Sequence, residues 1–107
     1  MDQELIIQAI KHRKPIEFEY NKPGKIQGKR IGNPHCIFVH PGTSQVDVDV
    51  FQTSGVSDSD LTLGLPWRRF TLAFMDNVRM MEKFSEFGIG EGYNSNSPLY
   101  IQSIQKI

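Results

Sequence analysis

The stretch that decides the fold is Trp67-Arg68-Arg69-Phe70-Thr71-Leu72-Ala73-Phe74-Met75. In an extended chain Phe70, Leu72 and Phe74 share one face, which predicts a core strand over residues 67–75. The strand starts with the only tryptophan of the chain beside two arginines. We therefore expect a flat π surface and two planar guanidinium groups at one edge of a sheet, a combination suited to phosphate, carboxylate or nucleobase recognition. The alternative is a core strand with solvated arginines at its entry.

Length and composition indicate one ordinary domain. The chain has 107 residues, and its 12 Lys and Arg balance its 12 Asp and Glu. Zero net charge argues against a general coat for nucleic acid but leaves a local basic patch open. The single cysteine, Cys36, excludes an intrachain disulfide and fits a reducing compartment. No apolar run approaches the ~20 residues of a membrane span, and the N-terminus is acidic where a signal peptide is basic. We predict a cytoplasmic protein with no membrane partner.

One helix is predicted over residues 2–13. Its apolar positions form a single stripe: Leu5, Ile6, Ala9 and Ile10. Pro15 ends the helix, because its ring disfavours helical backbone in the preceding residue. A helix this short is marginal alone, so the stripe should pack on a sheet.

Alternation and turn residues predict about five short strands. They are expected at residues 16–20, 36–40, 46–53, 67–75 and 78–81. Residues 25–30 are polar and are expected to be exposed. Asn33-Pro34 should break or kink the pairing, and Asp76-Asn77 should form a tight turn.

The C-terminal residues carry weaker signals. Residues 85–96 are predicted to be a flexible connector, and Ser97-Pro98 is typical of a helix start. The predicted organisation is a domain over residues 1–84 with a C-terminal extension, residues 85–107, packed on it or tethered to it. The predicted fold is mostly β with α: an N-terminal helix followed by a small, strongly bent, antiparallel five-stranded SH3-like or Sm-like barrel.

Several segments in this order resemble the WYL domain, a bacterial ligand-sensing module with an Sm-like barrel. They are the helix at residues 5–14, the strand at residues 16–20 that ends in Tyr20, Arg30 followed by Pro34 and residues 37–39, and the Arg-x-Phe-x-Leu segment at residues 68–72. The resemblance covers about residues 5–84. The Trp-Tyr-Leu triplet is absent near residues 46–48, and the second family arginine falls on Phe74. The resemblance therefore extends to the fold more fully than to the ligand site.

The candidate ligand-binding residues are Arg68, Trp67, Arg30, Tyr20 and Arg69. Arg68 is the main candidate, since a guanidinium can bind an anionic group in a bidentate manner. The alternative for Arg68 is a structural salt bridge to Glu17, Glu19 or Asp49. Tyr20 is expected in the core with its hydroxyl at the rim.

Neither a metal nor a cofactor is predicted. His35 and Cys36 are adjacent on a strand and should point to opposite faces, and His40 leaves the set without a fourth ligand. Asp47 and Asp49 share a strand face, which we interpret as solvated or arginine-paired rather than catalytic. No spacing typical of a nucleophile and its base occurs, so we predict that the protein is not an enzyme.

The leading hypothesis is a small regulatory or ligand-sensing domain that binds an anionic ligand, either a nucleotide or a short single-stranded nucleic acid. The alternative is an interaction module whose sheet edge and apolar tail dock onto a partner protein or onto a second copy of the chain.

Overall fold

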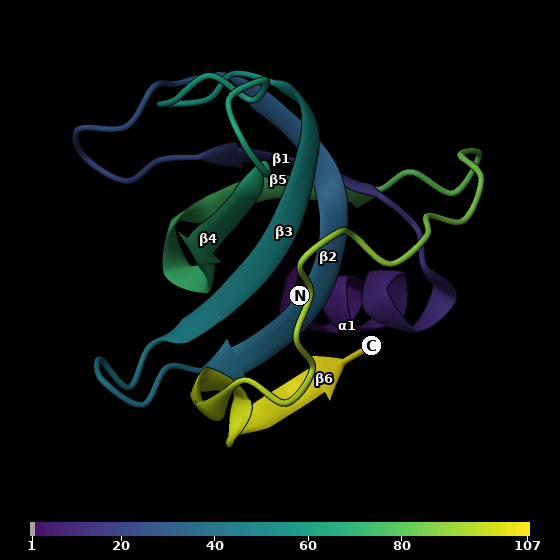
Figure 1. Ribbon diagram of the computed structural model, residues 1–107. Helices are drawn as coiled ribbons and strands as arrows, with labels where there is room; N and C mark the ends of the chain where they lie inside the picture. The colour runs from purple at the N-terminus through teal and green to yellow at the C-terminus, as the bar shows by residue number, and fades with distance from the viewer. Residues whose placement is uncertain (1) are drawn as a thin grey trace.

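The computed structural model describes residues 2–107 and is mostly β, with one N-terminal helix and an antiparallel sheet (Figure 1). The elements in chain order are α1 Asp2–His12, β1 Ile16–Tyr20, β2 Lys29–Val39, β3 Val46–Gly55, β4 Trp67–Thr71, the 3-10 turn η1 Leu72–Phe74, β5 Met75–Met80, the 3-10 turn η2 Pro98–Tyr100, and β6 Ser103–Lys106.

The sheet has six strands, not the five expected. Its order is β4-β3-β2-β1-β5, and β6 pairs with β2 outside this path. The sixth strand arises because β2, with 11 residues, is longer than the five-residue β1. β1 pairs with β2 over Lys29–Gly32, and β6 pairs with it over Cys36–Phe38. Within residues 2–107, β4 and β5 do not pair with each other, so hydrogen bonding does not close the sheet.

The predicted break at Asn33-Pro34 is wrong, because β2 continues through it. The pairing of β2 with β3 shifts between Ile31 and Gly32 and again between Pro34 and Cys36. Such bulges bend the strand, and they allow Pro34, which lacks a backbone N–H, to lie within it. This bend lets β2 pair with β1 near its start and with β6 near its end.

Residues 67–75 do not form one strand as predicted. β4 ends at Thr71, and η1 carries the chain from one end of the sheet to β5 at the other. Alternation missed this turn because Leu72 and Phe74 are both half-buried, as they would be on a strand. The turn predicted at Asp76-Asn77 is also wrong, because both residues lie in β5. Asn77 has a φ of 52° and lies where the pairing of β1 with β5 shifts register, so it forms a bulge.

The main core lies between α1 and the sheet. The predicted stripe of α1 is confirmed: Ile6, Ala9 and Ile10 are buried, and Leu5 is half-buried against them. A second, smaller core of Cys36, Phe38 and Tyr100 lies under the C-terminal segment. No helix within residues 2–107 is both long and apolar enough to cross a membrane.

The C-terminal segment crosses the sheet and ends as β6 (Figure 1). The helix start predicted at Ser97-Pro98 gives only one 3-10 turn, in which Ser97 Oγ accepts a hydrogen bond from the Leu99 N–H. The chain then extends, because β6 satisfies the edge of β2 that β1 leaves open.

The first prediction concerns the docking of α1. Ile6 is 0 % exposed, so Ile6→Ala should lower the free energy of unfolding by about 2–5 kcal/mol through lost burial and a residual cavity. Denaturant unfolding measures this change. Gln8→Ala, on the same helix at a partly exposed position, is the matched control and should shift the midpoint far less. An unchanged midpoint for Ile6→Ala would mean that α1 is peripheral.

Candidate functional site

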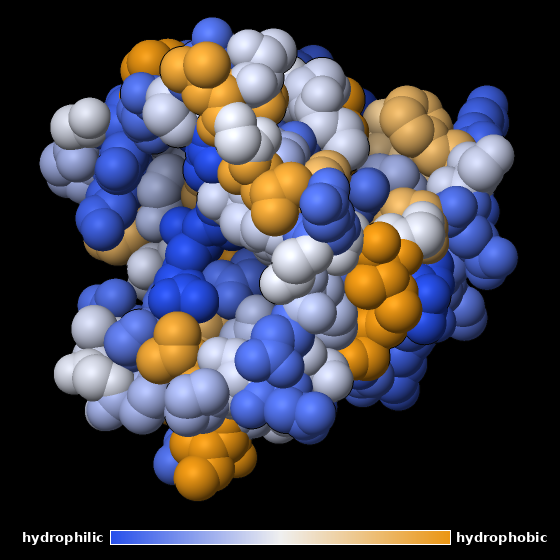
Figure 2. Space-filling view, viewed as in Figure 1, coloured by the Kyte–Doolittle hydropathy of each residue, from blue (hydrophilic) through white to orange (hydrophobic). Residues whose placement is uncertain are grey.

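A basic cavity of about 430 Å³ opens at the end of the sheet where β1, β2 and β4 meet the loops. Its cationic lining residues are Lys22, Lys25, Arg30, Arg68 and Arg69, and its anionic ones are Asp47 and Asp58. Figure 2 shows a hydrophilic hollow between the loop of residues 21–28 and the loop of residues 40–45. Five cations against two carboxylates give the cavity a local positive charge that the neutral chain as a whole lacks.

Arg30 forms the buried wall of this cavity. The sequence predicted an exposed segment here, but Arg30 is only 1 % exposed. Its Nη2 donates to the Ile26 carbonyl at 3.0 Å and to Asp58 Oδ2 at 3.3 Å. The guanidinium carbon also lies 5.8 Å from the Tyr20 ring centroid and 5.4 Å from that of Phe70. Arg30 tolerates burial because its aliphatic chain and its guanidinium, which lies over the aromatic rings, both suit an aromatic environment.

The guanidinium of Arg30 is not fully satisfied by the protein. Its Nε is buried and has no hydrogen-bond partner within residues 2–107. Nη2 is the only one of its nitrogens that donates a hydrogen bond there. A buried donor without an acceptor is costly, and such groups commonly mark a place for water or an ion.

Arg68 lies beside Arg30 and has only neutral partners. Its Nη2 donates to Ser59 Oγ at 2.7 Å and its Nη1 to the Trp67 carbonyl at 2.9 Å, with a longer contact of 3.4 Å from Nε to Ser57 Oγ. No carboxylate lies within ion-pair distance of Arg68 in the described chain. The predicted alternative of a salt bridge to Glu17, Glu19 or Asp49 is therefore wrong for this arginine.

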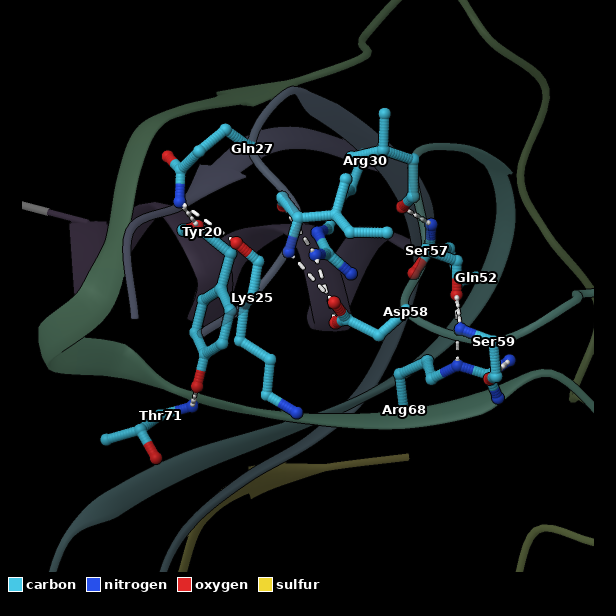
Figure 3. A network of polar contacts seen from close by, with 12 residues as sticks. Tyr20, Lys25, Gln27, Arg30, Gln52, Ser57, Asp58, Ser59, Arg68 and Thr71 are labelled. Atoms are coloured by element: carbon cyan, nitrogen blue, oxygen red, sulfur yellow. Dashed lines mark hydrogen bonds and ion pairs between the residues drawn. The ribbon is translucent and has the colours of Figure 1, made fainter. Parts of the chain in front are cut away.

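The loop of residues 56–66 holds both arginines in place (Figure 3). Asp58 contacts Arg30 and also accepts a hydrogen bond from the Ile26 N–H at 2.8 Å. That hydrogen bond, and to a lesser extent the Arg30 guanidinium, lowers the pKa of the Asp58 carboxyl. The loop can leave β3 so sharply because Gly55 has a φ of 90°, and a Cβ there would collide with the Lys29 carbonyl.

Tyr20 completes the inner wall. Its ring is buried, as predicted, and its hydroxyl oxygen accepts a hydrogen bond from the Thr71 N–H at 3.0 Å. In Figure 3 the Arg30–Asp58 pair lies between Tyr20 and Arg68. The Tyr20 hydroxyl therefore satisfies the Thr71 N–H, which lies on the outer edge of β4.

Arg69 lines the same cavity, but its guanidinium pairs on the other face of β4, because alternate residues of a strand face opposite ways. Its Nε and Nη2 form a bidentate ion pair with Asp49, at 2.7 and 2.9 Å, and Tyr100 donates to Asp49 Oδ2 at 2.6 Å. The hydrogen bonds to Asp49 raise the pKa of Arg69. The interpretation of Asp47 and Asp49 as an arginine-paired face is thus confirmed for Asp49, and neither is solvated, being 5 % and 7 % exposed.

Trp67 lies outside the basic cavity, in an aromatic cluster with His35 at its centre. The ring centroid of His35 is 4.8 Å from that of Trp67 and 5.1 Å from those of Phe87 and Tyr93. Trp67 Nε1 donates to the Glu91 carbonyl at 2.7 Å. The tryptophan thus anchors the C-terminal segment to β4 and does not share a wall with Arg30.

The imidazole of His35 uses both nitrogens inside the protein. Nδ1 lies 2.8 Å from the Asn33 carbonyl, so it carries the hydrogen, and Nε2 accepts the Gly90 N–H at 2.9 Å. Burial lowers the pKa of His35, and the charge of Arg13 adds to the effect, while the hydrogen bond to Asn33 opposes it. The ring has no nitrogen left for a metal.

Cys36 belongs to the second core, as expected of a small apolar residue. Its burial raises the pKa of the thiol to about 12, so the thiolate needed for nucleophilic or metal chemistry does not form near neutral pH. Within residues 2–107 no three His, Cys, Asp or Glu side chains are placed to hold a metal ion.

Four of the five predicted site residues therefore line one cavity: Tyr20, Arg30, Arg68 and Arg69. The fifth, Trp67, does not. The sequence missed the contribution of the loop residues Ser57, Asp58 and Ser59. Their short polar side chains, clustered after a strand, were the available signal, but which of them reach the arginines depends on how the loop folds back.

Comparisons with known proteins give no relative for this arrangement. No protein-family model matches the chain, and neither the curated proteins nor the solved structures contain a match. The resemblance to the WYL domain stays a prediction from the sequence motifs.

The second prediction follows from the neutral state of His35. Its pKa in the folded chain is lowered from the ordinary 6.5, so the unfolded chain binds the extra proton as the pH falls below that value. Stability should be full above about pH 6.5 and fall toward about pH 5.5, by at most about 1.4 kcal/mol per pH unit for one proton.

Denaturant unfolding at a series of pH values measures the loss, and NMR titration of the His35 ring reports its own pKa. His12→Gln, which changes an exposed histidine at the end of α1, is the control and should keep the same pH profile. Stability that is flat over this range, or a His35 ring that titrates at or above its ordinary pKa, would contradict the prediction.

Proposed function

We propose that this domain is a small, non-catalytic regulatory module that binds an anionic ligand in the basic cavity. The ligand class we propose is a nucleotide or a short single-stranded nucleic acid. The single observation that carries the proposal is Arg68, a half-buried guanidinium with no carboxylate partner in the described chain, in a cavity where cations outnumber anions. Protein guanidinium groups held this way suit phosphate oxygens.

The other cavity residues would contribute to binding in different ways. Lys22 and Lys25 are exposed on the loop that forms one rim and would add long-range attraction. Arg30 would bind more weakly than Arg68, because Asp58 already occupies its Nη2. The hydroxyl hydrogen of Tyr20, which no acceptor in residues 2–107 takes, would be available to a ligand oxygen.

We further propose that the sheet is a strongly bent SH3-like or Sm-like barrel related to the WYL domain and that the protein works in the cytoplasm. The strand order supports this, since β1, β2 and β3 are consecutive neighbours and η1 connects the two ends of the sheet. The family positions Arg30 and Arg68 line one cavity. Phe74, at the place of the second family arginine, is half-buried against the core and supplies no charge.

The alternative proposal is an interaction module for a partner protein or a second copy. One observation favours it: β4 and β5 are the end strands of the sheet and each has a single partner strand within residues 2–107. Free strand edges are pairing surfaces. On β4, however, Tyr20 takes the Thr71 N–H and so reduces the edge that is available.

The third prediction tests the anion site through Arg68→Ala. The probes are inorganic pyrophosphate, nucleotides and labelled short single-stranded DNA and RNA, titrated at low and moderate salt. Loss of a charge-assisted contact should weaken binding by about tenfold or more, and added salt should weaken binding to the wild-type protein. The fold should survive, because every partner that Arg68 leaves behind is neutral.

Arg79→Ala is the matched control. It removes the same charge from β5, where Arg79 pairs with Glu17 and does not line the basic cavity. Its affinity should match that of the wild type. No binding to the wild-type protein, or equal losses in the two variants, would reject the anion site and favour the interaction module.

The fourth prediction concerns Asp58, which competes with a ligand for Arg30. Asp58→Asn removes a negative charge while its side-chain oxygen can still accept the Ile26 N–H. Affinity for the same anions should rise by about threefold to tenfold at low salt and by less at moderate salt. Weaker binding by the variant would mean that Asp58 orients Arg30 for the ligand instead of opposing it.

A further inference from the structure

A second cavity of about 390 Å³ lies between β4 and the C-terminal segment, and it shares Arg68 and Arg69 with the basic cavity. Gly92, Tyr93, Asn94, Ser97 and Tyr100 line this cavity and not the basic one. We call it the aromatic cavity, because Trp67, Tyr93 and Tyr100 form much of its wall. Its volume is in the range of small-molecule sites, about 300–1,000 Å³.

The three aromatic rings are held by their polar ends. Trp67 Nε1 donates to the Glu91 carbonyl, the Tyr93 hydroxyl to the Ile107 carbonyl at 3.0 Å, and the Tyr100 hydroxyl to Asp49. The Trp67 and Tyr93 rings are near parallel, at 28° with centroids 6.0 Å apart. These rings therefore offer a ligand apolar surface in a fixed position, on which an aromatic ring can pack in an offset-stacked or edge-to-face arrangement.

Several donors of this cavity have no acceptor in the described chain. Asn94 uses its Oδ1 for the Asn96 N–H, which leaves its amide hydrogens without acceptors in the described chain. Ser97 Oγ accepts from the Leu99 N–H, so its hydroxyl hydrogen is also unused. Arg69 uses Nε and Nη2 on Asp49 and keeps Nη1. A ligand that complements these groups must bring acceptor oxygens.

The charge of the wall limits how negative the ligand can be. Asp49 lines the same cavity as Arg68 and Arg69. Its carboxylate neutralises Arg69 and repels a dianion more strongly than a monoanion. A singly charged carboxylate fits this balance better than a phosphate, which the basic cavity suits.

We infer that the aromatic cavity is a second ligand site, which binds a small planar aromatic carboxylate with its ring against Trp67 and Tyr93 and its carboxylate on Asn94, Ser97 and Arg69. This inference does not rest on the anion site: the two cavities share Arg68 and Arg69, but Trp67, Tyr93, Asn94 and Ser97 line only the aromatic one.

The experiment is a ¹H–¹⁵N NMR titration with benzoate. Trp67 is the only tryptophan, so its indole N–H gives a single resolved probe inside the cavity, and the Asn94 side-chain amide gives a second. Both signals should shift and saturate. Benzyl alcohol, which has the ring without the charge, and cyclohexanecarboxylate, which has the charge without the planar ring, should each bind more weakly by about fivefold or more.

Two variants locate the binding. Asn94→Leu, at an exposed position, removes the amide donor and narrows the cavity, and should weaken benzoate by about fivefold or more. Arg79→Ala removes a positive charge outside both cavities and should leave benzoate affinity unchanged.

The inference is overturned if neither cavity signal shifts up to the highest benzoate concentration that leaves the protein folded. It is also overturned if both comparison compounds bind as tightly as benzoate, or if Asn94→Leu binds it as tightly as the wild type. Uracil is a further test compound. If uracil bound more tightly than benzoate, the ligand of this cavity would not be a carboxylate.

Discussion

The structure depends on one constraint: every backbone N–H and C=O along the eleven residues of β2 needs a partner. β3 covers one edge of this strand along nearly its whole length. The other edge is divided between β1 and β6, which come from opposite ends of the chain. The C-terminal residues are thereby fixed on the sheet, and the segment that leads to β6 must cross its outer face. Both cavities follow from this arrangement, because one lies under the loops beside β1 and the other lies under the crossing segment.

The two adjacent arginines of β4 show how strand geometry separates identical side chains. Arg69 meets Asp49 in a bidentate pair, and the Tyr100 hydroxyl adds a third hydrogen bond to the same carboxylate. Arg68, one residue earlier, meets only hydroxyls and a carbonyl. A paired guanidinium stabilises the docked C-terminal segment, whereas one with neutral partners retains its attraction for an anion.

His35 links the predicted acid sensitivity of the fold to the aromatic cavity. The hydrogen bond from Gly90 to its Nε2 requires a neutral ring, and Gly90 lies just before the residues that line the cavity. Protonation of His35 Nε2 would put its N–H opposite the Gly90 N–H, so that two donors would face each other. The C-terminal segment is therefore held by groups of different kinds: β6 pairing, the Tyr100–Asp49 hydrogen bond, and an imidazole that is an acceptor only while it is neutral.

The sequence by itself determined what depends on local periodicity. It determined the apolar stripe of α1, the alternation of β1, and the burial of Tyr20 and Cys36. It failed where a local signal had two meanings. Leu72 and Phe74 fit a strand and a 3-10 turn equally well, and Pro34 signals a break unless a bulge absorbs it. Only the tertiary structure decided that residues 103–106 form a sixth strand, that Asp58 meets Arg30, and that Trp67 lies apart from Arg30. Each of these depends on which distant segment satisfies a strand edge or a buried charge, and the residues concerned are separated by tens of positions along the chain.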